Sequence, residues 1–236
     1  MQDLTPELAT NLAHYRTPKA IEAFAVYRFY PGEDYLYSKY FKKEDSVLDL
    51  ACGMARTTLL LHEMGIAVRG VDRSEVFIEI AKRRFPYLDL RIGSYDCIDE
   101  ADSSFSHIII SHNGIDCAFP ETQRIEALRE CARVLKPGGT LIFSSHNLRS
   151  FHFFSPYYRG RLGWKLRNTL NAFKKKTFIL EETEYLFYTV PEYVIQQTEA
   201  VGLRFVEMKG FERFRSDRID NFFSPYVHYV FEKPRK

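Results

Sequence analysis

Residues 47–74 read VLDLACGMARTTLLLHEMGIAVRGVDRS, and this stretch decides the fold. An apolar strand ends near Asp49, a loop of small residues follows over 51–55, and a helical pattern starts near Arg56. A tight loop between a strand and a helix lets backbone N–H groups approach the negative end of a ligand. The next strand ends at Asp72, whose carboxylate can accept both hydroxyls of an adenosine ribose. The stretch therefore predicts an adenosine-containing ligand.

Two adenosine cofactors compete for such a loop, and its composition distinguishes them. A dinucleotide-binding loop has the pattern GxGxxG, because a pyrophosphate approaches the main chain closely. Here Gly53 is the one glycine of the loop, and the charge of Asp49 would repel a pyrophosphate. The same charge attracts an ammonium, which S-adenosylmethionine carries together with a carboxylate and no phosphate. An oxidoreductase that uses a dinucleotide is the weaker alternative.

Apolar runs of strand length alternate with helical patterns over 46–145. This alternation is typical of successive βαβ units and a mostly parallel sheet. We predict an α/β, Rossmann-like fold with helices on both faces of a seven-stranded sheet. The predicted strands are 46–50, 67–72, 89–93, 105–111, 139–145, 203–211 and 225–232. The predicted helices are 56–64, 74–85, 120–135 and 191–201. The last two strands are joined without a helix and should pair antiparallel.

The composition excludes several classes of protein. Hydrophobic residues make up 45% and charged residues 27%, which excludes low-complexity and disordered chains. Lys and Arg number 33 against 31 acids, so no overall field indicates nucleic acid or a membrane surface. The start MQDLTPELAT is no leader, and no apolar run approaches the roughly 18 residues that cross a bilayer, so we expect a cytoplasmic protein. The four cysteines show no CxxC pairing and no histidine at ligand spacing, and no metal is expected.

Five blocks of the sequence resemble the class I S-adenosylmethionine-dependent methyltransferases, from about 46 to 145 and more weakly to the end. The blocks are VLDLACGMA, the acid in GVDRS, the turn GSYDC, the strand FSHIIISHNG and the segment ALRECARVLKPGGTLIFSSHN. Their joint order is more specific than any one of them. Two positions depart from the family pattern. Ala55 replaces the usual second loop glycine, and Ser106 stands where the fourth strand often begins Phe-Asp.

The resemblance implies a methyltransferase whose methyl donor is S-adenosylmethionine. It also implies a set of cofactor-binding residues, which can be given by the part of the cofactor that each would meet. These are Asp49 and the main chain of Ala51 and Gly53 for the methionine end, Asp72 and Arg73 for the ribose side, Asp96 and the backbone N–H of Cys97 for adenine, and Ser111 and Asn113 beside the transferring methyl.

Three further side chains are candidates for removing a proton from the methyl acceptor. The sulfonium already activates the methyl, so the protein must place a nucleophile in line with it and exclude water. A hydroxyl or protonated amine also benefits from a base near the carboxyl end of the fourth or fifth strand. His112, Asp116 and His146 are expected in those loops. The alternative is a structural role for each: a turn for His112, a helix cap for Asp116 and a loop hydrogen bond for His146.

We predict an N-terminal helical cap over 1–44 and a methyltransferase domain over 45–236. The cap would hold two helical pieces, the second over 18–30 and ended by Pro31 and Gly32. Residues 149–190 break the alternation and are too long for an ordinary connection, so they are predicted to be a substrate lid inserted after the fifth strand.

The insertion is also the predicted source of acceptor specificity. Between 149 and 180 there are eight Lys or Arg, no Asp or Glu, and eight aromatic residues. We predict that the aromatics roof a cavity and that Arg159, Arg161 or Lys165 meets an anionic group; the alternative is a solvated hairpin that binds nothing. The predicted reaction is methyl transfer to O or N of a small-molecule or peptide-like metabolite. RNA as acceptor, or a non-catalytic S-adenosylmethionine-binding partner protein, is the alternative, although neither nucleic acid nor a membrane is an expected partner.

Overall fold

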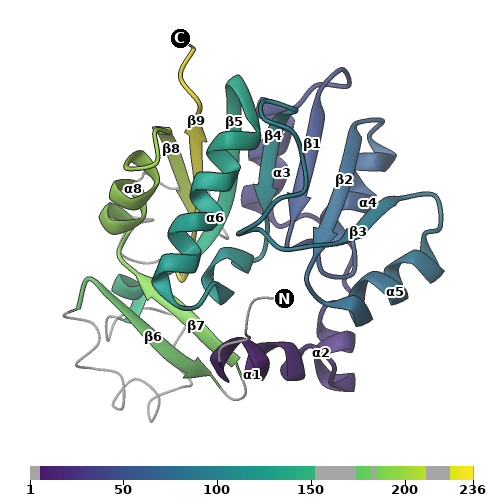
Figure 1. The fold of residues 1–236 in the computed structure, drawn as a ribbon, viewed down its shortest axis with the longest axis horizontal. Coiled ribbons are helices and arrows are strands. Elements are labelled where there is room, and N and C mark those ends of the chain that lie inside the picture. The colour runs from purple at the N-terminus through teal and green to yellow at the C-terminus, as the bar shows by residue number, and fades with distance from the viewer. Residues whose placement is uncertain (1–5, 152–173, 182–183, 211–223, 236) are drawn as a thin grey trace.

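The structure is a computed structural model that describes residues 6–151, 174–181, 184–210 and 224–235 (Figure 1). Nine strands form one sheet in the order β3-β2-β1-β4-β5-β7-β6, and β9 pairs with β5 and β8. The strands are β1 (Ser46–Leu50), β2 (Ala67–Asp72), β3 (Asp89–Ile92), β4 (Phe105–Ile110), β5 (Leu135–Asn147), β6 (Lys176–Glu181), β7 (Glu184–Thr189), β8 (Arg204–Gly210) and β9 (Tyr226–Glu232).

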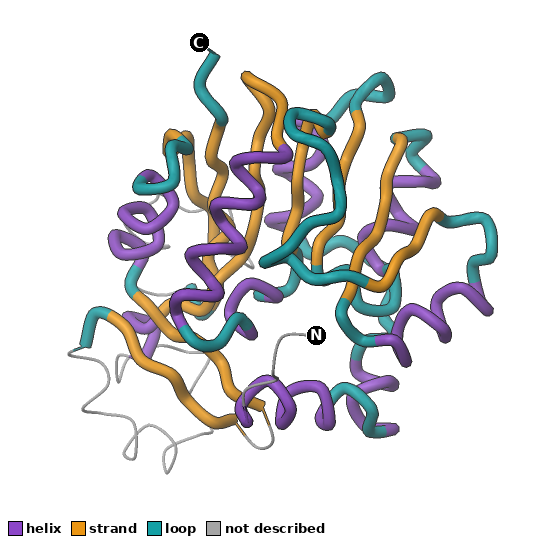
Figure 2. The backbone as a smooth tube through the Cα atoms, viewed as in Figure 1, coloured by secondary structure: helices purple, strands orange, loops and turns teal. Residues whose placement is uncertain are grey.

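Helices cover both faces of the sheet, as predicted (Figure 2). The α-helices are α1 (Pro6–His14), α2 (Pro18–Ala23), α3 (Pro31–Tyr40), α4 (Arg56–Glu63), α5 (Glu75–Arg84), α6 (Glu121–Val134) and α8 (Pro191–Glu199). Two short 3₁₀ helices, η1 (Gly114–Cys117) and η2 (Leu148–Phe151), follow β4 and β5. In Figure 1, α6 and α8 lie in front of the sheet and α3 and α4 lie behind it.

The two layers of the core follow from the alternation of side chains along each strand. On one face, Leu48 and Ile108 pack with Leu128 of α6 and Val194 of α8. On the other face, the neighbouring residues along β1 and β4 pack against Leu36 and Tyr37 of α3 and Leu61 of α4. Because the central strands are covered on both faces, they are almost continuously apolar, which is why the sequence identified them.

The pairing pattern confirms the predicted α/β fold class. Parallel ladders join β1 to β2 and β4, β2 to β3, and β4 to β5. The last two strands, β8 and β9, pair antiparallel, as expected for strands joined without a helix. The carboxyl ends of β1, β2 and β4 therefore meet at one edge, where the order of the strands reverses.

The predicted count of seven strands was wrong, because the residues that the structure describes already form nine strands of the sheet. The two additional strands, β6 and β7, form an antiparallel hairpin within the predicted insertion, and β7 also pairs in parallel with the end of β5. Leu186, Phe187 and Tyr188 of β7 are buried in succession, so this strand lacks the alternation that would have marked it. Residues 152–173 and 182–183 of the predicted lid, including Arg159, Arg161 and Lys165, lie outside the described residues.

The N-terminal segment has three helices where two were predicted. The second helix stops at Ala23, and Pro31 begins α3 instead of ending a helix. Proline suits the first position of a helix because its missing N–H would be unpaired there. Glu33 stabilises this start by accepting a hydrogen bond from the backbone N–H of Tyr30 at 2.9 Å. Among the described residues, no helix has both the length and the apolar character that a bilayer span requires.

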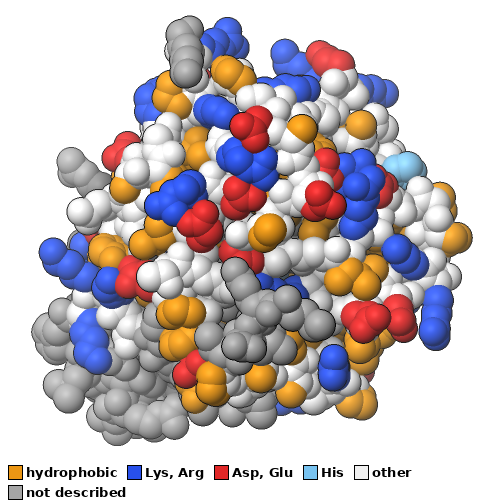
Figure 3. Space-filling view, viewed as in Figure 1, with side chains coloured by type: hydrophobic (Ala, Val, Ile, Leu, Met, Phe, Trp, Pro, Cys, Tyr) orange, Lys and Arg blue, Asp and Glu red, His pale blue; other side chains and the backbone are white. Residues whose placement is uncertain are grey.

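Charges of both signs are interspersed on the face shown in Figure 3. Several of the charged side chains of the described residues form ion pairs; Arg133, for example, contacts both Asp102 and Glu130 at 2.7 Å. This pattern agrees with the net charge of +2 and gives the visible face no single-sign stripe.

Candidate active site

The loop between β1 and α4 turns tightly because three of its residues take the left-handed backbone conformation. The φ angle is 54° at Ala51, 56° at Gly53 and 65° at Ala55. Glycine adopts this conformation without a steric penalty, and alanine carries the smallest side chain that meets it. The backbone N–H of Cys52 donates to Val71 O at 3.1 Å, which ties the loop to β2. The loop thus keeps its tight turn although Ala55 replaces a glycine.

Asp72, at the end of β2, braces this loop. Its Oδ2 accepts from the backbone N–H of Gly53 at 2.8 Å, and its Oδ1 accepts from the backbone N–H of Ser74 at 2.7 Å. Burial raises the pKa of the Asp72 carboxyl above its ordinary value, against these opposing hydrogen bonds. One carboxylate therefore joins the turn after β1 to the start of α5.

Asp49 lies one residue before the end of β1 and is completely buried. Its Oδ2 accepts from Thr58 Oγ1 at 2.7 Å, whereas Oδ1 has no hydrogen-bond partner among the described residues. Burial raises the pKa of Asp49 to about 7, and the nearby carboxylates of Glu33 and Asp72 act in the same direction. A buried carboxylate oxygen without a partner is costly, and a cationic ligand group would satisfy it.

A pocket lies where the carboxyl ends of β1, β2 and β4 meet. Its volume is about 1070 Å³ when the space at its mouth that is open to solvent is included. Six of the predicted site residues line it: Ala51, Gly53, Asp72, Arg73, Ser111 and His112. The other predicted residues, Asp49, Asp96, Cys97, Asn113, Asp116 and His146, are not among its lining residues.

The aromatic wall of this pocket was not predicted residue by residue. Tyr15 just after α1, Phe24 just after α2 and Phe77 of α5 lie with ring centroids 5.6–5.8 Å apart, and Phe24 meets the His112 ring edge-on at 5.3 Å. From the sequence, Tyr15, Arg28 or Tyr30 of the N-terminal helices were expected either to reach the cofactor or simply to pack, and Tyr15 and Tyr30 line the pocket. For Phe24 and Phe77 the signal was the aromatic content of 15%. It could not locate the wall, because three separate segments contribute to it.

The two predicted adenine-binding residues lie at the edge of the site. Asp96 accepts from Arg73 Nη2 at 2.8 Å and from Gln123 Nε2 at 2.7 Å. Burial opposes ionisation of Asp96, but the hydrogen bond from Ser94 and the charge of Arg73 hold its pKa below the ordinary value. Cys97 is exposed. Asp96 is thus ionised and already held by protein donors, and its role toward adenine stays a prediction.

The loop after β4 contains two further left-handed residues, His112 at φ 50° and Asn113 at φ 59°. Ser111, just before them, shares a 2.8 Å hydrogen bond with the hydroxyl of Tyr37. The backbone N–H of Asn113 donates to Ser144 Oγ at 2.8 Å, which joins this loop to β5. Strained non-glycine residues in succession are typical of functional loops.

Arg56 is a pocket residue that was not predicted as part of the site. It forms a bidentate ion pair with the buried Glu33 at 2.6 and 2.7 Å and lies over the ring of Tyr30 at 4.7 Å. Tyr30 in turn stacks on His112, with ring centroids 5.5 Å apart. Burial, together with the charge of Arg56, lowers the pKa of His112 to about 4. His112 is therefore a neutral ring and a weak base at neutral pH.

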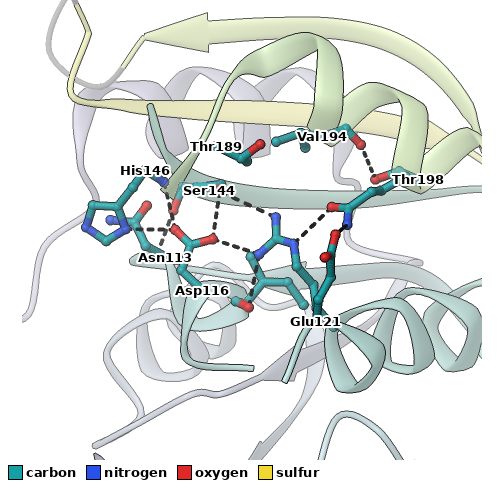
Figure 4. Close-up of polar contacts among 12 residues, drawn as sticks. Asn113, Asp116, Glu121, Ser144, His146, Thr189, Val194 and Thr198 are labelled. Carbon is teal, nitrogen blue, oxygen red and sulfur yellow. Dashed lines mark hydrogen bonds and ion pairs between the residues drawn. The ribbon is translucent and has the colours of Figure 1, made fainter. Parts of the chain in front are cut away.

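His146 and Asp116 form a buried pair at the end of β5 (Figure 4). His146 Nδ1 and the backbone N–H of His146 each lie 2.7 Å from Asp116 Oδ2. Because a carboxylate only accepts, Nδ1 carries the proton, and a neutral ring then has its lone pair on Nε2. Within the described residues, Nε2 has no hydrogen-bond partner. The ring packs between Tyr188 and Tyr226, at centroid distances of 4.4 and 4.9 Å.

The predicted site residues thus fall into two neighbouring groups. One group lies at the pocket, and the His146–Asp116 pair lies beside it, with Asp116 itself in η1. Cys117, next to Asp116 in η1, lines the pocket and so connects the two groups. In the part of the chain that the structure describes, no group of three or more His, Cys, Asp or Glu side chains is arranged to hold a metal ion.

Comparison with known proteins indicates a methyltransferase. A family model described as a methyltransferase domain matches residues 47–139. The ubiquinone biosynthesis O-methyltransferase of Coxiella burnetii is 29% identical over 180 residues, which are 75% of this chain and 70% of that protein. The demethylmenaquinone methyltransferase of Renibacterium salmoninarum is 31% identical over 112 residues, 48% of this chain and 46% of that protein. These relatives favour neither the RNA alternative nor the non-catalytic one.

Solved structures show the same fold over nearly the whole chain. An S-adenosylmethionine-dependent methyltransferase of Methanosarcina mazei has a TM-score of 0.68 at 16% identity and covers 88% of this chain and 99% of that one. The CcbJ methyltransferase of Streptomyces caelestis has a TM-score of 0.67 at 17% identity and covers 98% of this chain and 99% of that one. The motifs and the methyltransferase domain matched over residues 47–139 show a methyltransferase whose methyl donor is S-adenosylmethionine, and the chain has the fold of the S-adenosylmethionine-dependent methyltransferases.

Proposed function

We propose that this small-molecule methyltransferase transfers the methyl group to a hydroxyl oxygen of its acceptor and that His146 is the base. The observation that carries the proposal is the pairing of His146 Nδ1 with Asp116, which leaves Nε2 as a proton acceptor. A hydroxyl is a poor nucleophile until its proton is removed, so a positioned base is useful for this acceptor. The Coxiella burnetii relative is named as an O-methyltransferase, which supports the same choice.

The cofactor would lie in the pocket at the carboxyl ends of β1, β2 and β4. When bound, S-adenosylmethionine supplies a methyl group that its sulfonium has already activated. Asp49 Oδ1, buried behind the pocket lining and without a hydrogen-bond partner among the described residues, would attract the ammonium of the methionine end, directly or through water. Asp72 holds the turn at Gly53 and would accept from the ribose hydroxyls, since each carboxylate oxygen can accept a second bond.

His146 is the better base of the two histidine candidates. The pKa of His112 is lowered to about 4 by burial and by Arg56, so its ring accepts a proton poorly at neutral pH. His146 has a carboxylate behind it that stabilises the imidazolium formed when Nε2 takes the proton. The aromatic wall of the pocket, which includes Phe24 and Phe77, would keep water away from the transferring methyl.

The test replaces His146 by Gln and measures two quantities. Acceptors are found by incubating the enzyme with labelled S-adenosylmethionine and parallel panels of phenols, alcohols and amines. We expect methylated hydroxyls as products, and His146→Gln should lower kcat by about 10²–10⁴-fold, the usual contribution of a general base. The Kd for S-adenosylhomocysteine, from calorimetry, should stay close to that of the wild type.

The control is His62→Gln, because His62 lies on the exposed side of α4 and should affect neither quantity. Transfer only to amines would contradict the choice of oxygen. An unchanged kcat of His146→Gln with a verified acceptor would remove this histidine from the reaction.

A further inference from the structure

Arg124 of α6 is fully buried, and its guanidinium forms an ion pair with Asp116, the partner of His146. Its Nη1 donates to Asp116 Oδ1 at 2.7 Å and to Ile115 O at 3.0 Å. Nε lies 3.4 Å from Gln197 Oε1, and the guanidinium carbon lies 4.8 Å from the centre of the Phe187 ring. Contacts with Gln197 of α8 and Phe187 of β7 thus hold the guanidinium of Arg124 in the orientation in which it donates to Asp116.

Asp116 is itself surrounded by donors. On Oδ1 it accepts from Arg124 and from Ser145 Oγ, both at 2.7 Å. On Oδ2 it accepts from the backbone N–H and Nδ1 of His146, both at 2.7 Å. Arg124, Ser145 Oγ and the backbone N–H of His146 all donate to this carboxyl group, and the charge of the buried guanidinium favours the carboxylate. A carboxylate only accepts, so His146 Nδ1 is then the fourth donor. Oδ1 of Asp116 therefore binds Arg124 of α6 and Ser145, whereas Oδ2 binds His146.

We propose that Arg124 is a positioning residue for the reaction and acts on His146 through Asp116. By holding Oδ1, the guanidinium prevents the carboxylate from rotating away and keeps Oδ2 as the acceptor for Nδ1–H. The imidazole then stays in the tautomer that leaves Nε2 unprotonated. This inference rests on the proposed function, since it assigns Arg124 a part in catalysis only if His146 is the base.

A purely structural role for Arg124 would have different consequences. A buried ion pair often adds little to stability, whereas removing one partner leaves an uncompensated charge and is strongly destabilising. A structural brace would thus lower stability without selecting a histidine tautomer. The charged or titratable neighbours of the His146 ring are Asp116 of η1, Arg124 of α6, Tyr188 of β7, Tyr226 of β9 and, at longer range, His112. Among these, Asp116 is the group that holds Nδ1.

The experiment reads the tautomer directly by nitrogen NMR of the protein labelled at its histidine rings. The sequence has seven histidines, and the signals of His146 are assigned by their absence in His146→Gln. In the wild type we expect protonated Nδ1 and unprotonated Nε2. In Arg124→Met we expect the Nε2–H tautomer to become populated, with kcat lowered at least about tenfold and the Kd for S-adenosylhomocysteine within a few-fold of the wild type.

Two further variants make the result decisive. Arg133→Met removes another arginine of α6 that forms several hydrogen bonds away from the site, so it should change stability but neither the tautomer nor kcat. Arg124→Lys keeps the positive charge but lacks the planar set of donors of the guanidinium, and it is the variant to use if Arg124→Met does not fold. It should show a mixture of tautomers and an intermediate kcat.

An unchanged tautomer and unchanged kcat in a folded Arg124 variant would overturn the inference. The Nε2–H tautomer in the wild type would overturn it as well. Failure of the proposed function has a different signature: His146→Gln would keep its turnover whatever the Arg124 variants do to the tautomer.

Discussion

Asp49 combines complete burial, one unpartnered oxygen and a pKa raised to about 7 by desolvation. In the cofactor-free protein it is therefore half protonated near neutral pH. A neutral carboxyl attracts an ammonium much less than a carboxylate does. In the proposed role of Asp49 at the methionine end, cofactor binding would therefore be sensitive to pH in the physiological range.

We predict that the affinity for S-adenosylhomocysteine rises with pH up to about 7 and then levels off. Below pH 7 the protein must lose a proton from Asp49 in order to bind the ammonium, so affinity should fall by up to about tenfold per pH unit. Calorimetry between pH 5.5 and 8.5 measures this. Asp49→Asn should bind weakly with little pH dependence over the same range, and a flat wild-type profile would contradict the role given to Asp49.

At the scale of elements, the site depends on contact between the loop after β1 and the loop after β4. A Cβ built on Gly114, at the start of η1, would lie 2.7 Å from the Cβ of Ala51 and 3.2 Å from Ile110 Cγ2. Glycine at this position lets the two loops touch, and left-handed residues of both loops, Ala51, Gly53 and His112, line one pocket. Neither loop alone shapes the site.

We predict that Gly114→Ala forces these loops apart and weakens cofactor binding. Overpacking of this kind typically costs about 1–3 kcal/mol of stability, and here the displaced backbone also borders the pocket. The matched control is Gly65→Ala, at a φ of 81° with no atom within 4 Å of the new Cβ. It should cost about 1 kcal/mol through backbone strain and leave the cofactor Kd unchanged. Equal effects of both variants on Kd would show that loop contact is irrelevant.

At the scale of the whole molecule, α1 closes the pocket by binding a strand far away in sequence. The Asn11 side chain accepts from the backbone N–H of Tyr185 at 2.7 Å and donates to its carbonyl at 3.0 Å, so the amide pairs with β7 as another strand would. Tyr15 adds 3.0 Å contacts to Glu184 Oε2 and Cys117 Sγ. Figure 1 shows α1 beside the end of β7, below the carboxyl ends of the central strands.

We predict that Asn11→Leu releases α1 and raises the cofactor Kd by up to about 30-fold, because two hydrogen bonds to partly buried backbone groups, each contributing about 1 kcal/mol, are lost. Asn11 and Tyr15 both line the pocket, so the loss reaches the cofactor directly. Thr10→Val is the control, since Thr10 bonds only to Pro6 of its own helix in an exposed position. Calorimetry with S-adenosylhomocysteine separates the two variants, and an unchanged Kd in Asn11→Leu would show that this contact does not hold the pocket closed.

The elements that could be predicted are those whose signals are local. The strands 46–50 and 67–72 follow from their apolar runs, and the helix predicted over 74–85 begins after the N-cap residue Ser74. Pro31 was misjudged because proline suits both the end of one helix and the start of the next. The β6–β7 hairpin was not predicted because successive residues of β7 are apolar and buried, so its sequence lacks the alternation of apolar and polar residues that indicates a strand.

The family, the cofactor and the approximate place of the site were determined by the sequence itself, because a strand, its loop and the next carboxylate lie close together along the chain. Tertiary structure alone decided which distant groups meet. Arg124 reaches Gln197, Asn11 reaches Tyr185, and His146 receives a carboxylate from another loop. Such pairs depend on how the sheet and the helices pack, and the residues that packing brings together show no periodic pattern in the sequence.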